Sequence, residues 1–400
     1  MPGLSILRQG VLSITPILER MIALGATSVS AEEIGIVFNM ILQNQVSDAQ
    51  VVSFLTLLRS TNKDRDPDVV ARCAEHMIDA SSGVNIEALC NALEWQEQPI
   101  GNYQGGLCDI VGTGGDGHST FNVSTTASIV ASPILRMAKH GSRAQTSKSG
   151  SADMLNAINP TAPRIDAINK DNITKVYEAS NYAFLLSSNF HPKMVHINPL
   201  RKKLGIRTIF NILGPLSHPL TSAIEARVIG VAQKSLGPVF AEVLTQFKAK
   251  KALVVCGEEE MDEISCAGPT NCWGVTEGGD EGLQSEIFQL HPSDFGLTTH
   301  PLSEVCGGEG PEENAAILMR LLRNELPRGD PILDFVLLNT AALLVTSGAC
   351  EGPDDDHVIT ERGPGGGRWK EGVRRARWAI ESGEALRSLE RFIEVSNHLL

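Results

Sequence analysis

Short apolar runs alternate with helical windows along the chain from about Tyr103 onward. The runs are Leu107–Val111, Ala183–Leu186 and Leu253–Cys256, and the window 124–138 follows the first of them. Strands that alternate with helices pack as a largely parallel sheet between helices. We therefore predict an α/β domain over 103–400, with a central, mostly parallel sheet flanked by helices and a return to helix at about 369–399.

Residues 1–98 show helical patterns only. Between Ile34 and Leu42 the apolar residues recur at i, i+3, i+4, i+7 and i+8, which places them on one face of a helix. Ser30-Ala-Glu-Glu33 and Ser47-Asp-Ala-Gln50 have the spacing of capping boxes. Asp66-Pro67 offers a cap and a first-turn proline. The sequence thus predicts a small all-α N-terminal domain over 1–98.

The charge balance argues against nucleic acid and anionic membranes as the main partners. The 400 residues include 34 Lys and Arg against 47 Asp and Glu, a net charge of −13, and an acidic chain repels polyanions. The longest apolar stretch, Phe335–Val345, contains Asn339 and Thr340 and is too short to span a membrane. The eight cysteines form no C-x-x-C pair. With no leader pattern at the start, we predict free thiols and a cytoplasmic location.

A glycine-rich loop follows the first apolar run. Gly112-Thr-Gly-Gly-Asp-Gly117 matches G-x-G-x-x-G, but a dinucleotide site also requires an acidic residue about twenty positions further on. No Asp or Glu lies between Gly117 and Ala152, and no Gly-Lys-Ser/Thr follows. The loop therefore fits neither a dinucleotide fingerprint nor a Walker motif.

Hydroxyl groups are concentrated in the segment Thr120–Thr126, at the predicted start of a helix. Glycine backbone N–H groups and a helix N-terminus together bind phosphate well. A ligand-free turn capped by Ser or Thr is the alternative interpretation.

Two clusters of positive charge interrupt this acidic chain. The first consists of Arg136, Lys139, Arg143 and Lys148, and the second of Lys193, Arg201, Lys202, Lys203 and Arg207. Both fit a highly anionic substrate, although a solvated charged face is the common alternative.

An acidic segment, Gly257–Ser265, follows the apolar run that ends at Cys256. Carboxylates at the carboxyl end of a strand lie where α/β proteins bind ligands. Mg²⁺ usually takes one or two carboxylates and shares its other positions with phosphate and water. By spacing alone an acidic surface loop fits as well, and charge does not decide which carboxylates matter.

In combination, these motifs resemble the anthranilate phosphoribosyltransferase family, from about residue 11 to the C-terminus. The resemblance rests on Asp109-Ile-Val-Gly-Thr-Gly-Gly-Asp116, Thr120-Phe-Asn-Val-Ser-Thr125, Lys139-His-Gly-Ser-Arg143, Lys148-Ser-Gly-Ser-Ala-Asp153, Arg201-Lys-Lys-Leu-Gly-Ile-Arg-Thr-Ile-Phe-Asn-Ile-Leu-Gly-Pro-Leu216, Met261-Asp-Glu-Ile-Ser265 and Glu313-Asn-Ala-Ala-Ile317. Each motif is weakly specific alone, whereas the set in this order is highly specific.

The resemblance implies that the phosphoribosyl group of 5-phosphoribosyl 1-pyrophosphate is transferred to the amine of anthranilate in tryptophan biosynthesis, with release of pyrophosphate. It also implies two Mg²⁺ ions, a homodimer joined through the helical domain, and an anthranilate synthase as a candidate partner. A segment near 192–218 is expected to return to the helical domain.

The resemblance also assigns residues to each ligand. For phosphoribosyl pyrophosphate these are Gly112, Gly115, Asp116, Thr120, Asn122, Ser124, Thr125, Lys139, Ser147 and Ser151. For anthranilate they are Gly112, His140, Ser142, His191, Pro192 and Arg201. The implied metal ligands are Ser124, Asp262 and Glu263, and the implied catalytic residues are Lys139, Asp116 and Arg201.

The chain departs from the family pattern at two places. Ser142 stands where the family usually has Asn in Lys-His-Gly-Asn-Arg. A serine hydroxyl reaches less far and offers fewer donors than an amide, so we expect a weaker contact to substrate, which a water can bridge. The segment 352–367 is longer than usual, and we predict a flexible, peripheral insertion there.

Two other functions were considered. Pyrimidine nucleoside phosphorylases share the fold and a Lys-Ser-Gly phosphate motif, but they use inorganic phosphate and need no Asp-Glu magnesium pair. A non-catalytic, nucleic-acid-binding relative would have lost the loop residues and gained basic surface, whereas this loop is intact and the net charge is −13.

Overall fold

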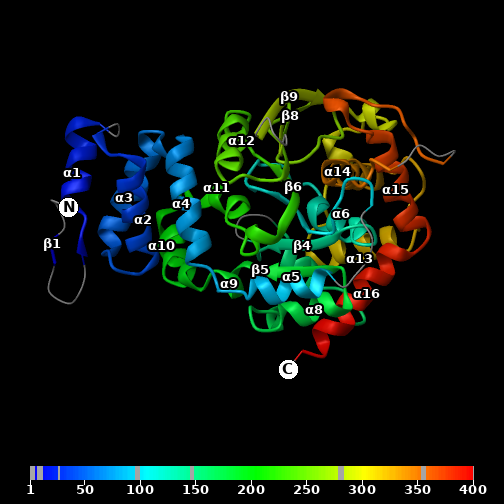
Figure 1. Ribbon diagram of the computed structural model, residues 1–400, viewed down its shortest axis with the longest axis horizontal. Helices are drawn as coiled ribbons and strands as arrows, with labels where there is room; N and C mark the ends of the chain where they lie inside the picture. Colours follow the sequence, from blue (N-terminus) through cyan, green and yellow to red (C-terminus); the bar gives the residue numbers. More distant parts are fainter. Residues whose placement is uncertain are drawn as a thin grey trace. The chain divides into compact units, whose positions relative to one another are not determined.

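The computed structural model describes residues 5–6, 12–25, 28–94, 100–144, 148–277, 283–352 and 357–399. The chain divides into two compact units (Figure 1). The helical unit consists of Met1–Gly83 and Phe190–Thr221, and the α/β unit of Val84–Asn189 and Ser222–Leu400. Ser147 and residues 353–356 of the expected insertion lie outside the described residues.

Two separate segments of the chain build the helical unit. Its helices are α1 (Thr15–Leu24), α2 (Ala31–Leu42), α3 (Asp48–Ser60), α4 (Pro67–Asp79), α10 (Ile197–Leu204) and α11 (Phe210–Leu213). The rings of Phe38 on α2 and Phe210 on α11 pack with centroids 4.9 Å apart and join the two segments. The prediction of helices only is wrong at the start, because β1 (Ser5–Ile6) and β2 (Leu12–Ser13) pair there as a short antiparallel ribbon.

Helix α5 (Ile86–Glu94) lies within the predicted helical domain but belongs to the α/β unit. Its apolar residues Leu89 and Leu93 are buried, and it packs against α8 (Ile173–Ala179). The periodicity of α5 predicted a helix correctly, whereas the partner of its apolar face depends on tertiary structure.

The helix caps explain where α2, α3 and α4 begin. Ser30 and Glu33 form the predicted capping box of α2, and Asp66 caps α4 with Pro67 in its first turn. The predicted box at Ser47 is wrong, because Ser47 makes no side-chain cap to α3. Gln50 instead donates hydrogen bonds to Ser13 Oγ (3.2 Å) and Thr15 Oγ1 (2.9 Å), so its amide ties α3 to the start of α1.

A seven-stranded sheet forms the centre of the α/β unit, in the order β5-β4-β3-β6-β7-β8-β9. The first five in this order are parallel, and β8 and β9 are added antiparallel. The strands are β3 (Leu107–Gly112), β4 (Arg136–Gly141), β5 (Tyr182–Leu186), β6 (Ile224–Gly230), β7 (Lys251–Gly257), β8 (Thr270–Glu277) and β9 (Leu283–Leu290). The predicted α/β class with a mostly parallel sheet is confirmed.

Helices surround this sheet (Figure 1). They are α6 (Val123–Ala131), α7 (Ser151–Asn156), α9 (Ser187–Phe190), α12 (Leu236–Gln246), α13 (Pro311–Leu322), α14 (Pro331–Ser347), α15 (Trp369–Glu381) and α16 (Glu384–Asn397), together with α5 and α8. Helix α12 contacts β7 and β8, α6 contacts β3 and β4, and α14 contacts β3, β6 and β7. Because helices cover the parallel strands, β5 and β6 are buried along their whole length.

The described residues 357–367 make specific contacts, and the flexible insertion expected over 352–367 stays a prediction. Arg362 pairs with Glu351 (2.6 Å), and Lys370 pairs with Glu361 (2.7 Å). Trp369 Nε1 donates to the carbonyl of Pro364 (2.9 Å). In the described part of the chain, no helix combines the length and apolar character required to cross a membrane.

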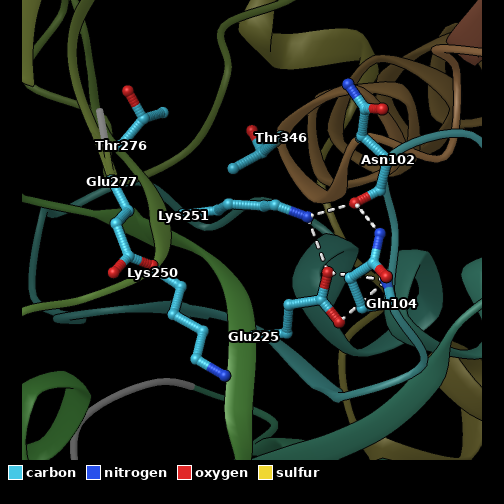
Figure 2. Close-up of a pocket in the computed structure, with 9 residues that line it drawn as sticks. Asn102, Gln104, Glu225, Lys250, Lys251, Thr276, Glu277 and Thr346 are labelled. Carbon is cyan, nitrogen blue, oxygen red and sulfur yellow. Dashed lines mark hydrogen bonds and ion pairs between the residues drawn. The ribbon is translucent and has the colours of Figure 1, made fainter. Parts of the chain in front are cut away.

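An ion pair lies at the amino-terminal ends of the adjacent strands β6 and β7 (Figure 2). Lys251 Nζ donates to Glu225 Oε1 (2.6 Å), to Asn102 O (2.6 Å) and to Ser347 O (2.8 Å). Glu225 also accepts from the backbone N–H groups of Gln104 (2.9 Å) and Gly106 (2.8 Å). The pair therefore joins β6, β7, the end of α14 and the segment that leads into β3.

We expect Glu225→Ala to lower the free energy of unfolding by about 3 kcal/mol, because it leaves a partly buried ammonium and two backbone donors without their acceptor. Urea denaturation measures this loss. The control is Lys250→Ala, which removes the exposed neighbour and should change stability by less than about 0.5 kcal/mol. Equal losses in the two variants would contradict the role of the ion pair.

Candidate active site

The strand order places the glycine loop at a topological switch point. From β3 the chain continues to β4 and β5 on one side of the sheet, and it returns to β6 on the other side of β3. Ligands of open α/β sheets bind outside the carboxyl ends of the strands where the order reverses. Here those ends are Gly112 of β3 and Gly230 of β6, which are register partners.

The acidic loop 258–263 lies directly on these two strand ends. A Cβ atom at Gly230 would overlap the carbonyl group of Asp262, and one at Gly112 would overlap the Asp262 carboxylate. The carboxylate Oδ2 accepts a hydrogen bond from the N–H of Gly114 (2.5 Å). Two residues without side chains thus allow Asp262 to reach the glycine loop.

The carboxyl groups of Asp116, Asp262 and Glu263 lie close enough to influence one another. Burial raises the pKa of Asp262 to about 8, and the charge and hydrogen bond of Asp116 act in the same direction. Burial also raises the pKa of Glu263 well above its usual range, and the charges of Asp262 and Asp116 add to this effect, whereas Lys139 and the Thr120 hydroxyl oppose it. Three carboxyl groups near one ammonium favour the arrival of a further cation.

Lys139 supplies the positive charge from β4, and its side chain is only 1% exposed. Its Nζ donates to the carbonyl of His140 (3.0 Å). Burial lowers the pKa of Lys139, and the carboxyl groups of Asp109 and Glu263 oppose that shift. Asp109 is itself buried on β3 beside Arg227 of β6 and accepts from the His140 N–H (3.3 Å).

The N-terminus of α6 presents unused polar groups. Asn122 precedes the helix without capping it by its side chain. The Asn122 Oδ1 atom and the fully buried Thr125 hydroxyl have no hydrogen-bond partner among the described residues. Gly114, Gly115 and Gly117 of the preceding loop have positive φ angles, a conformation that favours glycine. This end of the helix is suited to an anion.

A second loop supports the glycine loop from behind. The N–H of Phe121 donates to Val305 O (2.9 Å), and the N–H of Gly307 donates to Ser119 O (3.1 Å). Asn314 of the Glu313-Asn-Ala-Ala-Ile317 motif accepts from the Gly308 N–H (2.7 Å). That motif therefore holds a loop against Thr120 and Phe121.

The loop after β4 contains Ser142. Its carbonyl accepts from the N–H of Ala152 (3.2 Å), and the residue is exposed. Asp153 accepts from the N–H groups of Ala144 (2.7 Å) and Gly150 (3.2 Å). The Asp153 carboxylate therefore holds the backbone at both Ala144 and Gly150. Ser151, which the resemblance assigns to phosphoribosyl pyrophosphate, is the first residue of α7.

The first positive cluster is largely paired with protein groups. Arg136 is buried and donates to Gly105 O (2.7 Å). Arg143 pairs with Asp166 (2.9 Å), and Lys148 pairs with Glu309 (2.7 Å). Lys139 is therefore the member of this cluster that lies among the candidate metal carboxylates.

Three predicted anthranilate residues belong to the helical unit. His191 is buried, and burial lowers its pKa to about 4, so its imidazole is neutral at pH 7. Pro192 begins an exposed 3₁₀ turn, Pro192–Val195. The guanidinium of Arg201 lies over the ring of Phe210, 5.5 Å from its centroid, and donates to Asn198 Oδ1 (3.3 Å). Their assignment to anthranilate stays a prediction.

A cavity of about 440 Å³ lies elsewhere in the α/β unit (Figure 2). Its lining includes Glu225 and Lys251, near the amino-terminal ends of β6 and β7. The candidate site is at the opposite, carboxyl ends of the same strands. In Figure 2 the dashed contacts join Lys251 and Glu225 with Asn102 and Gln104 on one side of the cavity. We assign this cavity no role in the chemistry.

The residues fit a magnesium ion that is shared with phosphate. The buried Glu263 Oε2 atom has no partner among the described residues, and an unsatisfied buried carboxylate oxygen is costly without a cation or donor. No group of three or more His, Cys, Asp and Glu side chains in the described ranges is arranged to hold a metal alone. Mg²⁺ needs no such cage, because phosphate and water supply its other ligands.

Gly230, Asp109 and Asn314 also support this site, although no sequence pattern assigned them a role. Gly230 is a strand end whose register partner is known only once the sheet is assembled. Asp109 lies inside a quoted motif, but its contact to the backbone of His140 crosses 31 residues. Asn314 also lies inside a quoted motif, and its bond to the Gly308 N–H is local; only the fold shows that the loop it holds packs beside Phe121.

Comparisons with known proteins cover both units. A model described as glycosyl transferase family, helical bundle domain, matches residues 15–81, and one described as glycosyl transferase family, a/b domain, matches residues 104–386. The anthranilate phosphoribosyltransferase of Schizosaccharomyces pombe is 40% identical over 360 residues, 89% of this chain and 90% of that protein. The Saccharomyces cerevisiae enzyme is 38% identical over 352 residues, 86% and 85% of the two chains.

Solved structures agree with these similarities. Anthranilate phosphoribosyltransferase from Saccharomyces cerevisiae in complex with PRPP and Mg superposes with a TM-score of 0.79 at 34% identity, over 97% of this chain and 99% of that chain. The Thermus thermophilus enzyme superposes with a TM-score of 0.72 at 33% identity, over 92% and 96%.

We expect Gly230→Ala to displace the 258–263 loop, because the added methyl group overlaps the backbone of Asp262. The free energy of unfolding should fall by about 1–3 kcal/mol, as for other overpacked sites, and amide hydrogen exchange should accelerate over 258–265. The control is Gly214→Ala, whose Cβ meets no atom within 4 Å. Unchanged exchange in Gly230→Ala would show that the loop does not depend on this close approach.

Proposed function

The chain belongs to the anthranilate phosphoribosyltransferase family, and we propose that it transfers the phosphoribosyl group of 5-phosphoribosyl 1-pyrophosphate to anthranilate in tryptophan biosynthesis. The observation that carries the proposal is the contact of Asp262 with Gly112, Gly114 and Gly230. It brings the candidate metal carboxylates to a phosphate-type loop at the switch point of the sheet.

In the proposed reaction, a bond forms between the amine nitrogen of anthranilate and C1 of the ribose. The C1–O bond breaks, its electron pair leaves with pyrophosphate, and the amine releases its proton to solvent. An aromatic amine is unprotonated at neutral pH, so the reaction needs no strong base. The work of the chain is to align the amine and to stabilise the charge that develops on the leaving group.

The glycine loop and the acidic loop 258–263 have different roles in the proposal. The N–H groups of the loop around Gly114 and Gly115, the α6 N-terminus and the Thr125 hydroxyl bind the pyrophosphate oxygens, and Lys139 neutralises part of their charge. Asp262 and Glu263 would hold Mg²⁺, with Ser124 on a second ion, and the metal supplies Lewis-acid stabilisation of pyrophosphate. The charge of Asp116 acts on Asp262, and the hydrogen bond from the Gly114 N–H to Asp262 Oδ2 (2.5 Å) holds the acidic loop to the glycine loop.

The acceptor and the assembly complete the proposal. The other proposed contacts to phosphoribosyl pyrophosphate are Gly112, Thr120, Asn122, Ser147 and Ser151. The proposed contacts to anthranilate are Gly112, His140, Ser142, His191, Pro192 and Arg201. A homodimer through the helical unit is supported by Ile22 and Leu24 of α1, whose side chains are 70% and 71% exposed. A cytoplasmic location and an anthranilate synthase partner are also proposed.

Anthranilate fluorescence tests the reaction and the metal loop together. The purified protein with phosphoribosyl pyrophosphate and Mg²⁺ should consume the fluorescence, and Asp262→Asn/Glu263→Gln should lower the rate by more than about 100-fold, since the variant cannot hold the ion on the leaving group. The matched control is Glu260→Gln, an exposed carboxylate of the same loop, which should retain near-normal activity.

Each failure has its own meaning in this assay. If the unmodified protein consumes no anthranilate, the proposed substrate is wrong. If the double variant retains the activity of Glu260→Gln, the reaction stands and the assignment of the metal carboxylates is wrong.

We expect Ser142→Asn to lower KM for anthranilate by about 2- to 10-fold with little change in kcat. The longer amide regains one hydrogen bond, worth about 0.5–1.5 kcal/mol. Steady-state kinetics at saturating phosphoribosyl pyrophosphate measure the change, and Ser142→Ala is the control that should raise KM or leave it unchanged. A fall in kcat with constant KM would contradict a binding role for this position.

A further inference from the structure

A buried amide at the centre of α14 holds Ile264, the residue that follows the acidic loop 258–263. Asn339 is 1% exposed and lies in a stretch, residues 333–344, that is buried at every position. Its Oδ1 accepts from the N–H of Ile264 (3.0 Å), and its Nδ2 donates to Ile264 O (3.2 Å) and to Phe335 O (3.0 Å). A buried amide is tolerated here because its donors and its acceptor are used.

These bonds fix the peptide groups on both sides of Ile264. The N–H of Ile264 belongs to the peptide unit that it shares with Glu263, and its carbonyl belongs to the unit that follows. The two bonds therefore restrain the backbone beside Glu263. In a buried apolar helix, Leu or Ala would suit position 339 better by propensity, so the amide is explained by its partner in the loop.

The loop needs such an anchor before a cation binds. The buried Asp262 lies against the ends of two strands and against Gly114, so the loop brings the carboxyl groups of Asp262 and Glu263 to the glycine loop before any cation arrives. Gly230 leaves room for the backbone of Asp262 at the carboxyl end of β6, whereas Asn339 bonds to the residue after Glu263. The loop is thus held from two sides without a contribution from metal.

From these contacts we propose that Asn339 is a positioning residue that preorganises Asp262 and Glu263 for Mg²⁺. The proposal rests on the metal assignment made under the proposed function. Groups that orient metal ligands from behind typically contribute about 10–100-fold in metal affinity, and we expect this loss when the amide is removed.

The test compares Asn339→Leu, which keeps the number and branching of the side-chain heavy atoms, with Thr340→Val. Thr340 is the buried neighbour, and its hydroxyl donates within α14 to Val336 O (2.8 Å). Mn²⁺ binding in the presence of pyrophosphate is followed by electron paramagnetic resonance, and the Mg²⁺ dependence of the rate is measured alongside KM for anthranilate. We expect Asn339→Leu to weaken Mn²⁺ binding by about 10–100-fold, to be rescued by excess Mg²⁺, and to leave KM for anthranilate near normal.

Other outcomes overturn the proposal. Equal Mn²⁺ affinity in Asn339→Leu and Thr340→Val would show that the amide does not position the loop. Mn²⁺ binding by the unmodified protein that survives Asp262→Asn/Glu263→Gln would instead overturn the metal assignment, and this inference with it.

Two further measurements apply if Asn339→Leu does not fold. Asn339→Asp keeps the acceptor for Ile264 N–H and loses the donor to its carbonyl, so it should show an intermediate loss of Mn²⁺ affinity. In the unmodified protein, the Ile264 amide should exchange hydrogen far more slowly than that of Glu260 in the exposed turn. Similar exchange of the two amides would overturn the proposal without any variant.

Discussion

The close approach of Asp262 to two glycines is the contact on which the candidate site depends. Gly112 and Gly230 end adjacent parallel strands, and any side chain there would occupy the space of Asp262. Both strands lie inside the sheet, with a neighbouring strand on each side. The glycine loop after β3 and the acidic loop after β7 meet there through the bond from the Gly114 N–H to Asp262 Oδ2.

Buried charge explains why so many supporting contacts surround this place. Lys139, Asp109 and Arg227 are buried in β4, β3 and β6, and the carboxyl groups of Asp262 and Glu263 have raised pKa values. Such a cluster costs stability in the absence of ligands. The bonds of Asn339 to the backbone of Ile264 offset the tendency of like charges to separate, and a cation with polyphosphate would complete the neutralisation.

The sequence predicted elements and motifs better than their partners. The period of Ile34, Val37 and Phe38 correctly indicated α2, and the apolar runs correctly indicated β3, β5 and β7, because these patterns are local. The side chain of Gln50, the packing of α5, and the role of Gly230 depend on residues far away in the sequence. Asn339 interrupts an apolar stretch, a visible signal, but its partner Ile264 is known only from the fold.

In the proposed reaction the segment after β4 serves both substrates, with Ser142 assigned to anthranilate and Ser151 to phosphoribosyl pyrophosphate. The glycine loop follows β3 and the acidic loop 258–263 follows β7, whereas His140 and Ser142 lie at the end of β4. Asp153 holds the segment after β4 by bonds to Ala144 and Gly150. Since these bonds do not involve the 258–263 loop, we expect a change at position 142 to leave the candidate metal carboxylates in place.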